Sequence, residues 1–182
     1  MAEPLASAPP LPTPDARWHG IGLSVALCPH ATIWQLEGPR DIVRASSLPR
    51  PGRCLAHESG LVLCIGPDVY LHLGAGADID AWRAGFRAVI EMSSAWTHLA
   101  VEGPHAIGLL RKGCAVDLHP RVFSAGACAA TGMARMRVVL WRPGVDSRYE
   151  LLVGRSYALS LWSWLMEAAE EYGGEREKEG VR

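Results

Sequence analysis

A short triplet that ends an apolar run occurs twice in the chain, and it constrains the fold more than any other feature. The run at 31–37 ends in Glu37-Gly38-Pro39, and the run at 97–102 ends in Glu102-Gly103-Pro104. Similar patterns of apolar residues follow both triplets. Because internal repetition marks repeated supersecondary units, the sequence predicts two tandem units of related architecture.

Each predicted unit has the order β-α-β-β-α. The first comprises a strand at 31–37, a helix at 40–46, strands at 61–65 and 69–73, and a helix at 79–90. The second comprises a strand at 97–102, a helix at 105–112, strands at 137–141 and 148–153, and a helix at 157–172. Gly66-Pro67-Asp68 and the turn around Pro143-Gly144 are typical of hairpins. We therefore expect an α+β fold with antiparallel sheets and helices packed on them.

The ends of the chain differ in composition from its middle. Five of the first 15 residues are proline, which is typical of a flexible leader. The last ten residues are charged and rich in glycine, which indicates a frayed tail. The predicted division is a leader at 1–18, a first unit at 19–92, a second unit at 93–172 and a disordered tail at 173–182. We expect the two units to form one compact domain.

The final predicted helix carries apolar residues in two groups. One stripe holds Tyr157, Leu161, Trp164, Leu165, Ala168 and Tyr172, and a second group holds Leu159, Trp162 and Met166. A surface helix needs one apolar stripe. Two stripes indicate either a helix deep inside its own domain or a helix covered by a partner, because Trp and Met are enriched at interfaces. The second group is therefore our predicted partner interface.

Common catalytic and nucleotide-binding motifs are absent from the sequence. It has no glycine-rich phosphate loop and no serine-hydrolase elbow, and its seven histidines show no metal-binding spacing. A net charge of −1 gives no strong attraction to nucleic acid. We therefore predict no catalytic residues and no metal site in this chain.

Cys114, His119 and Cys128 are the sharpest candidates for chemistry. All three side chains can bind a metal, but their spacing matches no common zinc pattern. A Cys–His nucleophilic pair would need a lowered thiol pKa and a third, orienting group. Buried thiols and a histidine in a long ordered loop at 114–127 are the simpler interpretation.

Charged side chains near this loop also allow two interpretations. Asp117 is either an acid–base group or a turn residue whose carboxylate binds nearby amides. Arg135, Arg137 and Arg142 either hold an anionic ligand or lie on an exposed strand face or at a subunit salt bridge.

The five cysteines and the N-terminus indicate the compartment. The cysteine number is odd and no pair has CxxC spacing, so we expect reduced thiols rather than disulfides. No signal-peptide pattern and no apolar run of membrane-spanning length is present. We expect a cytoplasmic protein.

The segment Lys112–Pro120 reads KGCAVDLHP and resembles the gamma subunit of heterotetrameric sarcosine oxidase. The similarity extends from about residue 91 to residue 165. It includes Phe123, Gly126, Cys128, Thr131, Val139–Arg142, Tyr149–Val153 and Arg155–Ala158.

This resemblance implies a fold similar to the folate-binding fold of the glycine-cleavage aminomethyltransferase. It also implies assembly with alpha, beta and delta subunits that together oxidatively demethylate sarcosine or a related N-methyl amino acid. Tetrahydrofolate would accept the one-carbon unit, and the FAD, FMN, NAD and zinc would lie on the partner subunits. The family's gamma subunit supplies no catalytic residue that can be carried over.

Two other functions remain open from the residues alone. One is a stand-alone folate-binding or aminomethyl-transfer protein, for which Glu102 and Asp117 are the candidate carboxylates. The other is a small metal- or thiol-dependent enzyme that uses Cys114, His119 and Cys128.

Overall fold

The fold was obtained as a computed structural model. It describes residues 15–29, 32–39, 48–74, 79–173 and 175–176. The predicted helix at 40–46 lies outside the described residues, as do the first 14 residues of the predicted leader.

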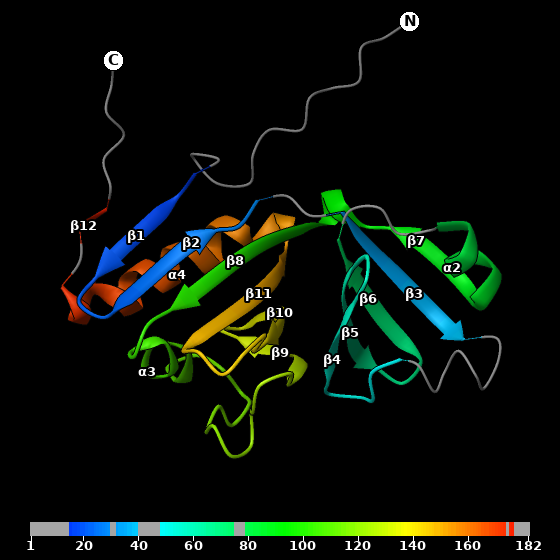
Figure 1. The fold of residues 1–182 in the computed structure, drawn as a ribbon. Coiled ribbons are helices and arrows are strands. Elements are labelled where there is room, and N and C mark those ends of the chain that lie inside the picture. The colour runs from blue at the N-terminus through cyan, green and yellow to red at the C-terminus, as the bar shows by residue number, and fades with distance from the viewer. Residues whose placement is uncertain (1–14, 30–31, 40–47, 75–78, 174, 177–182) are drawn as a thin grey trace, which may run out of the picture.

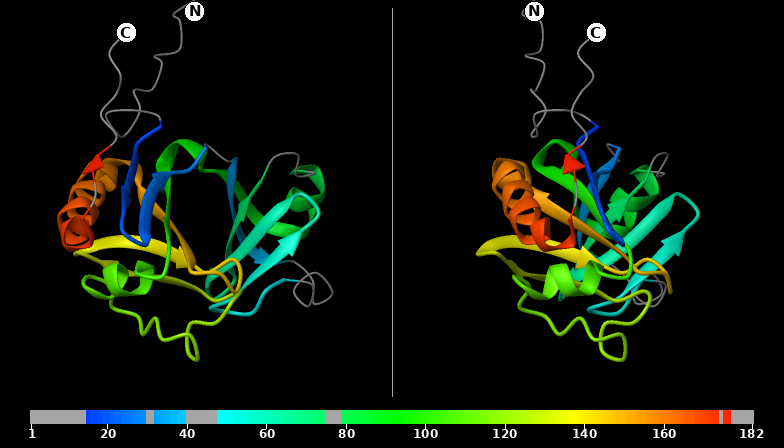
Figure 2. Two further views of the ribbon diagram at one scale, coloured as in Figure 1. Left: turned by 60° about the vertical axis from the view of Figure 1, so that its left-hand side comes forward. Right: turned by 90° about the vertical axis from the view of Figure 1, so that its left-hand side faces the viewer.

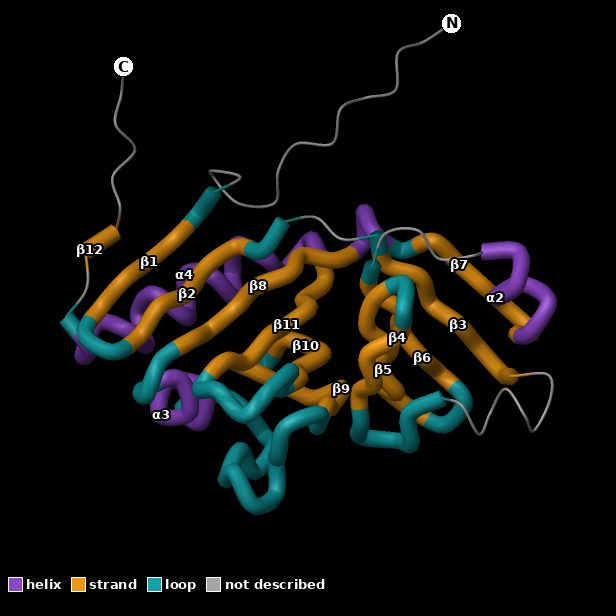
Figure 3. The backbone as a smooth tube through the Cα atoms, in the orientation of Figure 1, coloured by secondary structure: helices purple, strands orange, loops and turns teal. Residues whose placement is uncertain are grey.

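Two antiparallel sheets form most of the molecule (Figures 1 and 3). The strands are β1 (Arg17–Gly20), β2 (Leu23–Leu27), β3 (Ile33–Pro39), β4 (Cys54–His57), β5 (Gly60–Gly66), β6 (Val69–Leu73), β7 (Phe86–Glu91), β8 (Trp96–Glu102), β9 (Cys128–Met133), β10 (Met136–Trp141), β11 (Arg148–Gly154) and β12 (Glu175–Arg176). The helices are α2 (Ile79–Gly85), α3 (Ala106–Arg111) and α4 (Ala158–Ala169), with 3₁₀ turns η1 (Ser93–Ala95), η2 (Arg155–Tyr157) and η3 (Glu170–Tyr172).

The strand orders confirm the predicted α+β class. The seven-stranded sheet has the order β12-β1-β2-β8-β11-β10-β9, and the five-stranded sheet has the order β4-β5-β6-β3-β7. The central strands β3 and β8 are each followed by a meander of three strands, and the last strand of each meander pairs with the central strand. The repeat in the sequence is thus a repeat in topology.

The two sheets exchange one strand with each other. β2 comes just before β3 in the sequence but pairs with β8, and β7 comes just before β8 but pairs with β3. The predicted boundary between residues 92 and 93 separates the two meanders. Each sheet nevertheless needs a strand from the other side of that boundary.

The repeated triplets end β3 and β8 through their glycines. Gly38 and Gly103 have φ angles of 57° and 119°, which favour glycine. A Cβ atom at Gly103 would lie 2.4 Å from the carbonyl oxygen of Gly22. The glycine therefore lets the β8 terminus approach the β1–β2 turn.

The predicted helix at 79–90 is wrong beyond Gly85. The chain leaves α2 there and continues as β7, which pairs with β3 from Trp34↔Glu91 to Pro39↔Phe86. Pairing with the edge of β3 satisfies the backbone of 86–91 in place of further helical hydrogen bonds.

The ordered region also extends further at both ends than the sequence predicted. Trp18 was placed in the flexible leader, but it lies in β1 and is only 3% exposed. Within the predicted tail, β12 pairs with β1 through Trp18↔Arg176 and His19↔Glu175.

The sheets and helices are arranged in layers (Figure 2), and three clusters of apolar side chains pack them together. The largest cluster fills the space between the seven-stranded sheet and helices α3 and α4. A second cluster, which includes Trp141, Leu152 and Leu71, packs the two sheets together, and a third lies between the five-stranded sheet and α2. None of the described helices has the length and apolar character needed to cross a bilayer.

Backbone hydrogen bonds join the two sheets along a seam, which comprises residues 52–54 and 126–128. The Cys54 N–H donates to the Gly126 carbonyl (2.8 Å), and the Cys128 N–H donates to the Gly52 carbonyl (2.9 Å). The Arg53 guanidinium crosses the same seam and donates to Ser124 Oγ and to the Ala125 carbonyl. The loop 114–127 is therefore fixed to the five-stranded sheet, as expected of an ordered loop.

Candidate functional site

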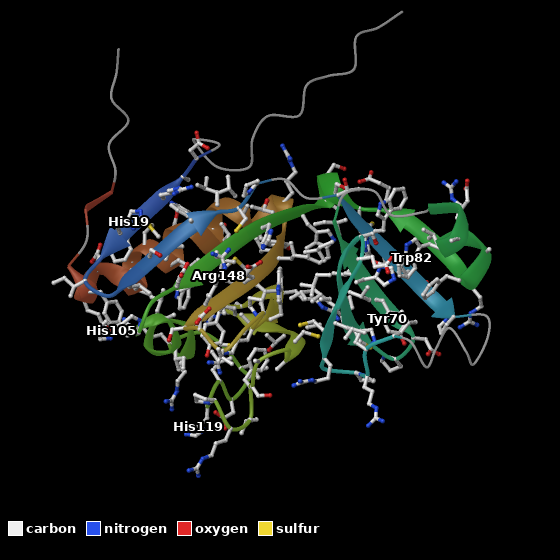
Figure 4. The ribbon with its side chains drawn as sticks, in the orientation of Figure 1. His19, Tyr70, Trp82, His105, His119 and Arg148 are labelled. Carbon is white, nitrogen blue, oxygen red and sulfur yellow. The ribbon has the colours of Figure 1, made fainter. Side chains whose placement is uncertain are left out.

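The most concentrated set of buried charges lies on β8 and β11, on the face of the seven-stranded sheet that is turned toward the other sheet. His98 Nε2 donates to Glu150 Oε2 (2.7 Å), and Arg148 Nε donates to Glu150 Oε1 (2.8 Å). Arg148 also pairs with Glu102 (3.2 Å). Both side chains of the His98–Glu150 pair are 14% exposed. Figure 4 shows Arg148 on β11 within this sheet.

Both members of the central pair are charged near neutral pH. Burial acts to lower the pKa of His98, but interactions with Cys28 and Glu150 outweigh it and raise the pKa to about 9. Burial acts to raise the pKa of Glu150, but hydrogen bonds from His98 and Arg148 lower it below its usual range. Each Glu150 oxygen already accepts a charged donor. Glu150 is thus held in an ion pair and is not a free acid or base, whereas His98 Nδ1 is buried without a hydrogen-bond partner among the described residues.

A second polar cluster ties the β4–β5 turn to β6. Ser59 Oγ lies 3.1 Å from His57 Nδ1 and 3.0 Å from His72 Nε2. The ring of Trp82 lies 5.4 Å from both imidazole rings, measured between centroids.

The geometry of this cluster only partly matches a serine–histidine pair. Among the described residues, no group orients His72 through its buried Nδ1. Burial, and then the nearby His57, lower the pKa of His72. A serine nucleophile needs a base that is itself oriented, so the cluster is a packing contact between the β4–β5 turn and β6.

Cys114, His119 and Cys128 do not come together. The Cys128 thiol is buried in the seam and donates to the carbonyls of Arg53 (3.1 Å) and Cys64 (3.2 Å). Burial, followed by the neighbouring Cys54 and Cys64, raises its pKa to about 12. His119 lies on the outer loop, away from the two sheets (Figure 4). Within the described parts of the chain, no three His, Cys, Asp or Glu side chains are grouped as metal ligands.

Asp117 is a turn residue, as the second interpretation of it predicted. Its Oδ1 atom accepts the His119 N–H (2.9 Å), and His119 Nδ1 in turn accepts the Arg121 N–H (3.3 Å). Glu102, the other candidate carboxylate, pairs with Arg148 as described above. Neither carboxylate is among the residues that line the described hollow at the β9–β10 hairpin.

The other members of the Lys112–Pro120 segment also make internal contacts. Lys112 Nζ bonds to the Ala168 carbonyl and to Glu171 (2.7 Å) at the end of α4. A Cβ atom on Gly113 would lie 2.6 Å from the Trp164 ring. Leu118 is fully buried in the main core. The most distinctive sequence segment therefore builds the contact between α3, the loop and α4.

The candidate anion ligands Arg135, Arg137 and Arg142 do not act together in the structure. Arg142 donates to the carbonyls of Phe123 (3.4 Å) and Val145 (2.8 Å), and its guanidinium lies 5.7 Å from the Tyr149 ring centroid. This arginine connects two loops and is unavailable as an anion ligand. Arg135 and Arg137 instead line a hollow of about 410 Å³ at the β9–β10 hairpin.

The prediction of two opposite apolar stripes on α4 is wrong. Met166 is only 3% exposed and belongs to the main core, and Trp162 packs against the same core. At about 100° per residue, both lie beside the buried Ala158 and Ala169, so the helix has one broad apolar arc. Leu159, at the rim of this arc, is 53% exposed.

The buried network of His98, Arg148 and Glu150 was not predicted as a site. The predicted strand at 148–153 places Arg148 and Glu150 on one face, because side chains alternate along a strand. That signal was present in the sequence. The pairing of β11 with β8, which brings His98 to Glu150, was not.

Comparisons with known proteins agree on one family. The model described as "Sarcosine oxidase, gamma subunit family" matches residues 80–171. The chain is 34% identical over 124 residues to the sarcosine oxidase subunit gamma of Corynebacterium sp. (strain P-1), a match that covers 65% of this chain and 61% of that protein. It is 35% identical over 123 residues to the corresponding subunit of Arthrobacter sp., covering 64% of this chain and 60% of that protein. The chain thus spans about three fifths of the length of these relatives.

Solved structures with the same fold include two different proteins. One is the heterotetrameric sarcosine oxidase from Corynebacterium sp. U-96 in complex with pyrrole 2-carboxylate, with a TM-score of 0.75 and 26% identity over 87% of this chain and 91% of the matched chain. The other is the glycine cleavage system aminomethyltransferase T from Bartonella henselae, with a TM-score of 0.59 and 17% identity over 81% of this chain and 46% of that chain. The second likeness shows a shared fold.

Proposed function

Because the chain belongs to the sarcosine oxidase gamma subunit family, we propose that it is a non-catalytic assembly subunit of a sarcosine oxidase-like complex. The complex would be a flavin-dependent heterotetramer with alpha, beta and delta partners. It would oxidatively demethylate sarcosine or a related N-methyl amino acid, with tetrahydrofolate as the one-carbon acceptor. FAD, FMN, NAD and zinc would be held by the partner subunits. The proposal includes the cytoplasmic location expected from the unpaired thiols.

The observation that carries this proposal is the internal use of the family segment Lys112–Pro120. Lys112, Gly113, Asp117 and Leu118 each make a packing or hydrogen-bond contact within the chain. A segment that is distinctive because it shapes the fold supports a role in assembly. A catalytic segment would instead present its polar groups to a substrate.

The partner surface that we propose is the exposed rim of α4. Leu159 remains a candidate because it is 53% exposed, and the preceding Tyr157 is 55% exposed. Trp162 is half-buried and would form the inner margin of the surface. Met166 is excluded from it, because its side chain is already covered by the main core.

Affinity purification of the tagged full-length chain from its own cells tests the function. We expect subunits with a flavin absorbance spectrum to co-purify in a fixed ratio. Recovery of the chain alone, as a stable monomer, would contradict the proposal. Tight binding of tetrahydrofolate by the purified chain would instead favour the stand-alone folate-binding function.

Co-expression of variants with the partner subunits tests the surface separately. Leu159→Glu should lower recovery of the complex at least tenfold, because it introduces a charge into an apolar contact. Ser160→Glu is the matched control, because Ser160 is also exposed on α4 but lies about 100° around the helix from Leu159, and it should leave recovery unchanged. Equal recovery with both variants would place the interface elsewhere without affecting the proposed function.

A further inference from the structure

The hairpin formed by β9 and β10 carries a hollow that the proposed function does not use. Its volume is about 410 Å³, and its lining residues are Ala130, Thr131, Gly132, Arg135, Met136 and Arg137. Small-molecule sites commonly occupy several hundred Å³. The hollow is therefore large enough for a small ligand.

The floor of the hollow is made of small residues. Ala130 and Gly132 are exposed and, two residues apart on β9, face the same side of the sheet. No atom lies within 4 Å of the position that a Cβ on Gly132 would take. Arg137 is the direct register partner of Gly132, so its side chain rises from the same face beside this floor.

The turn that presents Arg135 is held in an uncommon backbone conformation. Ala134 and Arg135 have φ angles of 47° and 67°, in the left-handed region where side chains are disfavoured. The Ala134 N–H donates to the Gly113 carbonyl (3.0 Å), and Met133 forms a bridge with Cys114. Two-residue hairpin turns commonly require positive φ at both central residues, and contacts with the end of α3 fix this turn and with it the backbone of Arg135.

The two guanidinium groups carry charge that the protein leaves unmatched. In the part of the chain that the structure describes, neither Arg135 nor Arg137 forms an ion pair or side-chain hydrogen bond. Together they present two positive charges at one end of an uncharged floor. A single carboxylate would neutralise one of them, whereas a phosphate monoester carries a charge of about −1.5 to −2 at pH 7.

We propose that this hollow binds a small molecule through a phosphate monoester group. The guanidinium groups of Arg135 and Arg137 hold the phosphate oxygens, since their planar donor pairs match phosphate geometry. The remainder of the ligand lies over Ala130 and Gly132. Arg142, although close in sequence, does not line the hollow, and its two Nη atoms donate to loop carbonyls.

Titration of the full-length protein with phenyl phosphate at low ionic strength tests the charge requirement. Chemical shifts of the amides in residues 130–137 should change and saturate. Arg135→Gln and Arg137→Gln should each weaken binding at least tenfold, and phenyl sulfate, a monoanion of similar shape, should bind at least fivefold more weakly. The matched control is Arg121→Gln, an exposed arginine outside the hollow, which should change the affinity less than twofold.

A second variant separates a shaped site from simple attraction to positive charge. Gly132→Val fills the floor without changing any charge, and the open space at this position should allow it to fold. We expect it to weaken phenyl phosphate binding at least tenfold and inorganic phosphate binding less than threefold. An effect of Arg121→Gln equal to that of Arg137→Gln, or unchanged phenyl phosphate binding by Gly132→Val, would overturn the proposal.

Discussion

The end of α3 lies against α4, and the contact between them involves Lys112, Gly113 and Trp164. Lys112 donates to the Ala168 carbonyl near the end of α4 and pairs with Glu171, and its ammonium lies 5.3 Å from the Tyr172 ring centroid. Gly113 leaves the space that the Trp164 ring occupies. The glycine in this segment is thus required by packing, since its φ angle lies outside the positive region.

Gly113→Ala tests this requirement. The added methyl group would lie 2.6 Å from the Trp164 ring, so the ring must move, and overpacking of this kind costs about 1–3 kcal/mol of stability. The measurement is the free energy of urea unfolding. Gly144→Ala is the control, because no atom lies within 4 Å of its Cβ position, and it should change stability by less than about 0.5 kcal/mol. Equal losses of stability in the two variants would show that contact with Trp164 is not the reason for glycine at position 113.

Because of the His98–Glu150 pair, the free energy of unfolding should fall as the pH rises into the alkaline range. The folded pKa of His98 is raised to about 9 from its ordinary 6.5, so the folded chain binds the proton more tightly than the unfolded chain. The stabilisation is complete below pH 6.5 and is lost as the pH rises through about 9. At 1.4 kcal/mol per pKa unit, the loss is about 3 kcal/mol.

Unfolding free energies measured between pH 6 and pH 10 check this expectation. Glu150→Gln removes the charged partner, so this variant should be less stable at pH 6 and should lose less stability than the wild type as the pH rises. A parallel decline of both proteins across this range would show that His98 is not the responsible group. The chemical shift of His98 provides an independent reading of its pKa.

At the level of elements, α4 shows how one broad apolar arc stabilises a helix against a sheet. Leu161 and Leu165 are fully buried, whereas Leu159 is 53% exposed on the same helix. Leu165→Ala should therefore cost about 2–5 kcal/mol of unfolding free energy, through lost burial and the cavity that remains. Leu159→Ala is the same substitution at an exposed position and should lower the unfolding free energy by less than about 0.5 kcal/mol. Similar costs for the two leucines in urea unfolding would show that the burial of α4 differs from this description.

Sequence patterns predicted those elements whose signals are local. The Gly66-Pro67-Asp68 turn, the strands at 69–73 and 148–153, and the start of the helix after Gly103-Pro104 agree with the structure. Residues 86–90 were predicted as the end of a helix at 79–90, but they lie in β7. Its strand conformation depends on the free edge of β3, a partner more than 45 residues away that no local pattern identifies.

In the candidate site, too, only contacts between residues close in sequence could be predicted. The interpretation of Asp117 as a turn residue that binds nearby amides needed only local sequence, and its bond to the His119 N–H spans two residues. The His98–Glu150 pair spans 52 residues and requires the register Leu152↔His98, so it could not be predicted from spacing. The two-stripe interpretation of α4 failed because Ala158 and Ala169, which link Trp162 to Leu165, are too small to stand out in an apolar pattern.

At the scale of the whole molecule, the exchange of β2 and β7 makes the two units interdependent. A fragment of residues 93–182 contains β8 but lacks β2, so its seven-stranded sheet is interrupted beside the central strand β8. We expect fragments 1–92 and 93–182 to be unfolded separately, as judged by amide dispersion in NMR spectra. Mixing them should restore native dispersion in part. Independent folding of either fragment would contradict the interdependence.

The seam provides a second connection whose strength is measurable. Arg53 Nη1 donates to Ser124 Oγ (3.1 Å) across the two sheets. Because the bond is exposed to solvent, a double-mutant cycle of Arg53→Ala and Ser124→Ala should give a coupling of about 0.5 kcal/mol. A cycle that pairs Arg53→Ala with the distant Ser163→Ala should give none. Zero coupling would show that the bond between Arg53 and Ser124 does not contribute to the stability of the seam.

The exchanged strands also impose an order on synthesis of the chain. β2 ends at Leu27, but its partner β8 ends at Glu102. At the usual ribosomal rate of about 5–20 residues per second, the β1–β2 hairpin waits roughly 4–15 s for that partner. During this interval the apolar face that contains Trp18 and Val25 has no sheet to join. The β1–β2 hairpin is thus synthesised first but joins its sheet late. Nascent chains stalled before β8 should therefore need chaperones to avoid aggregation.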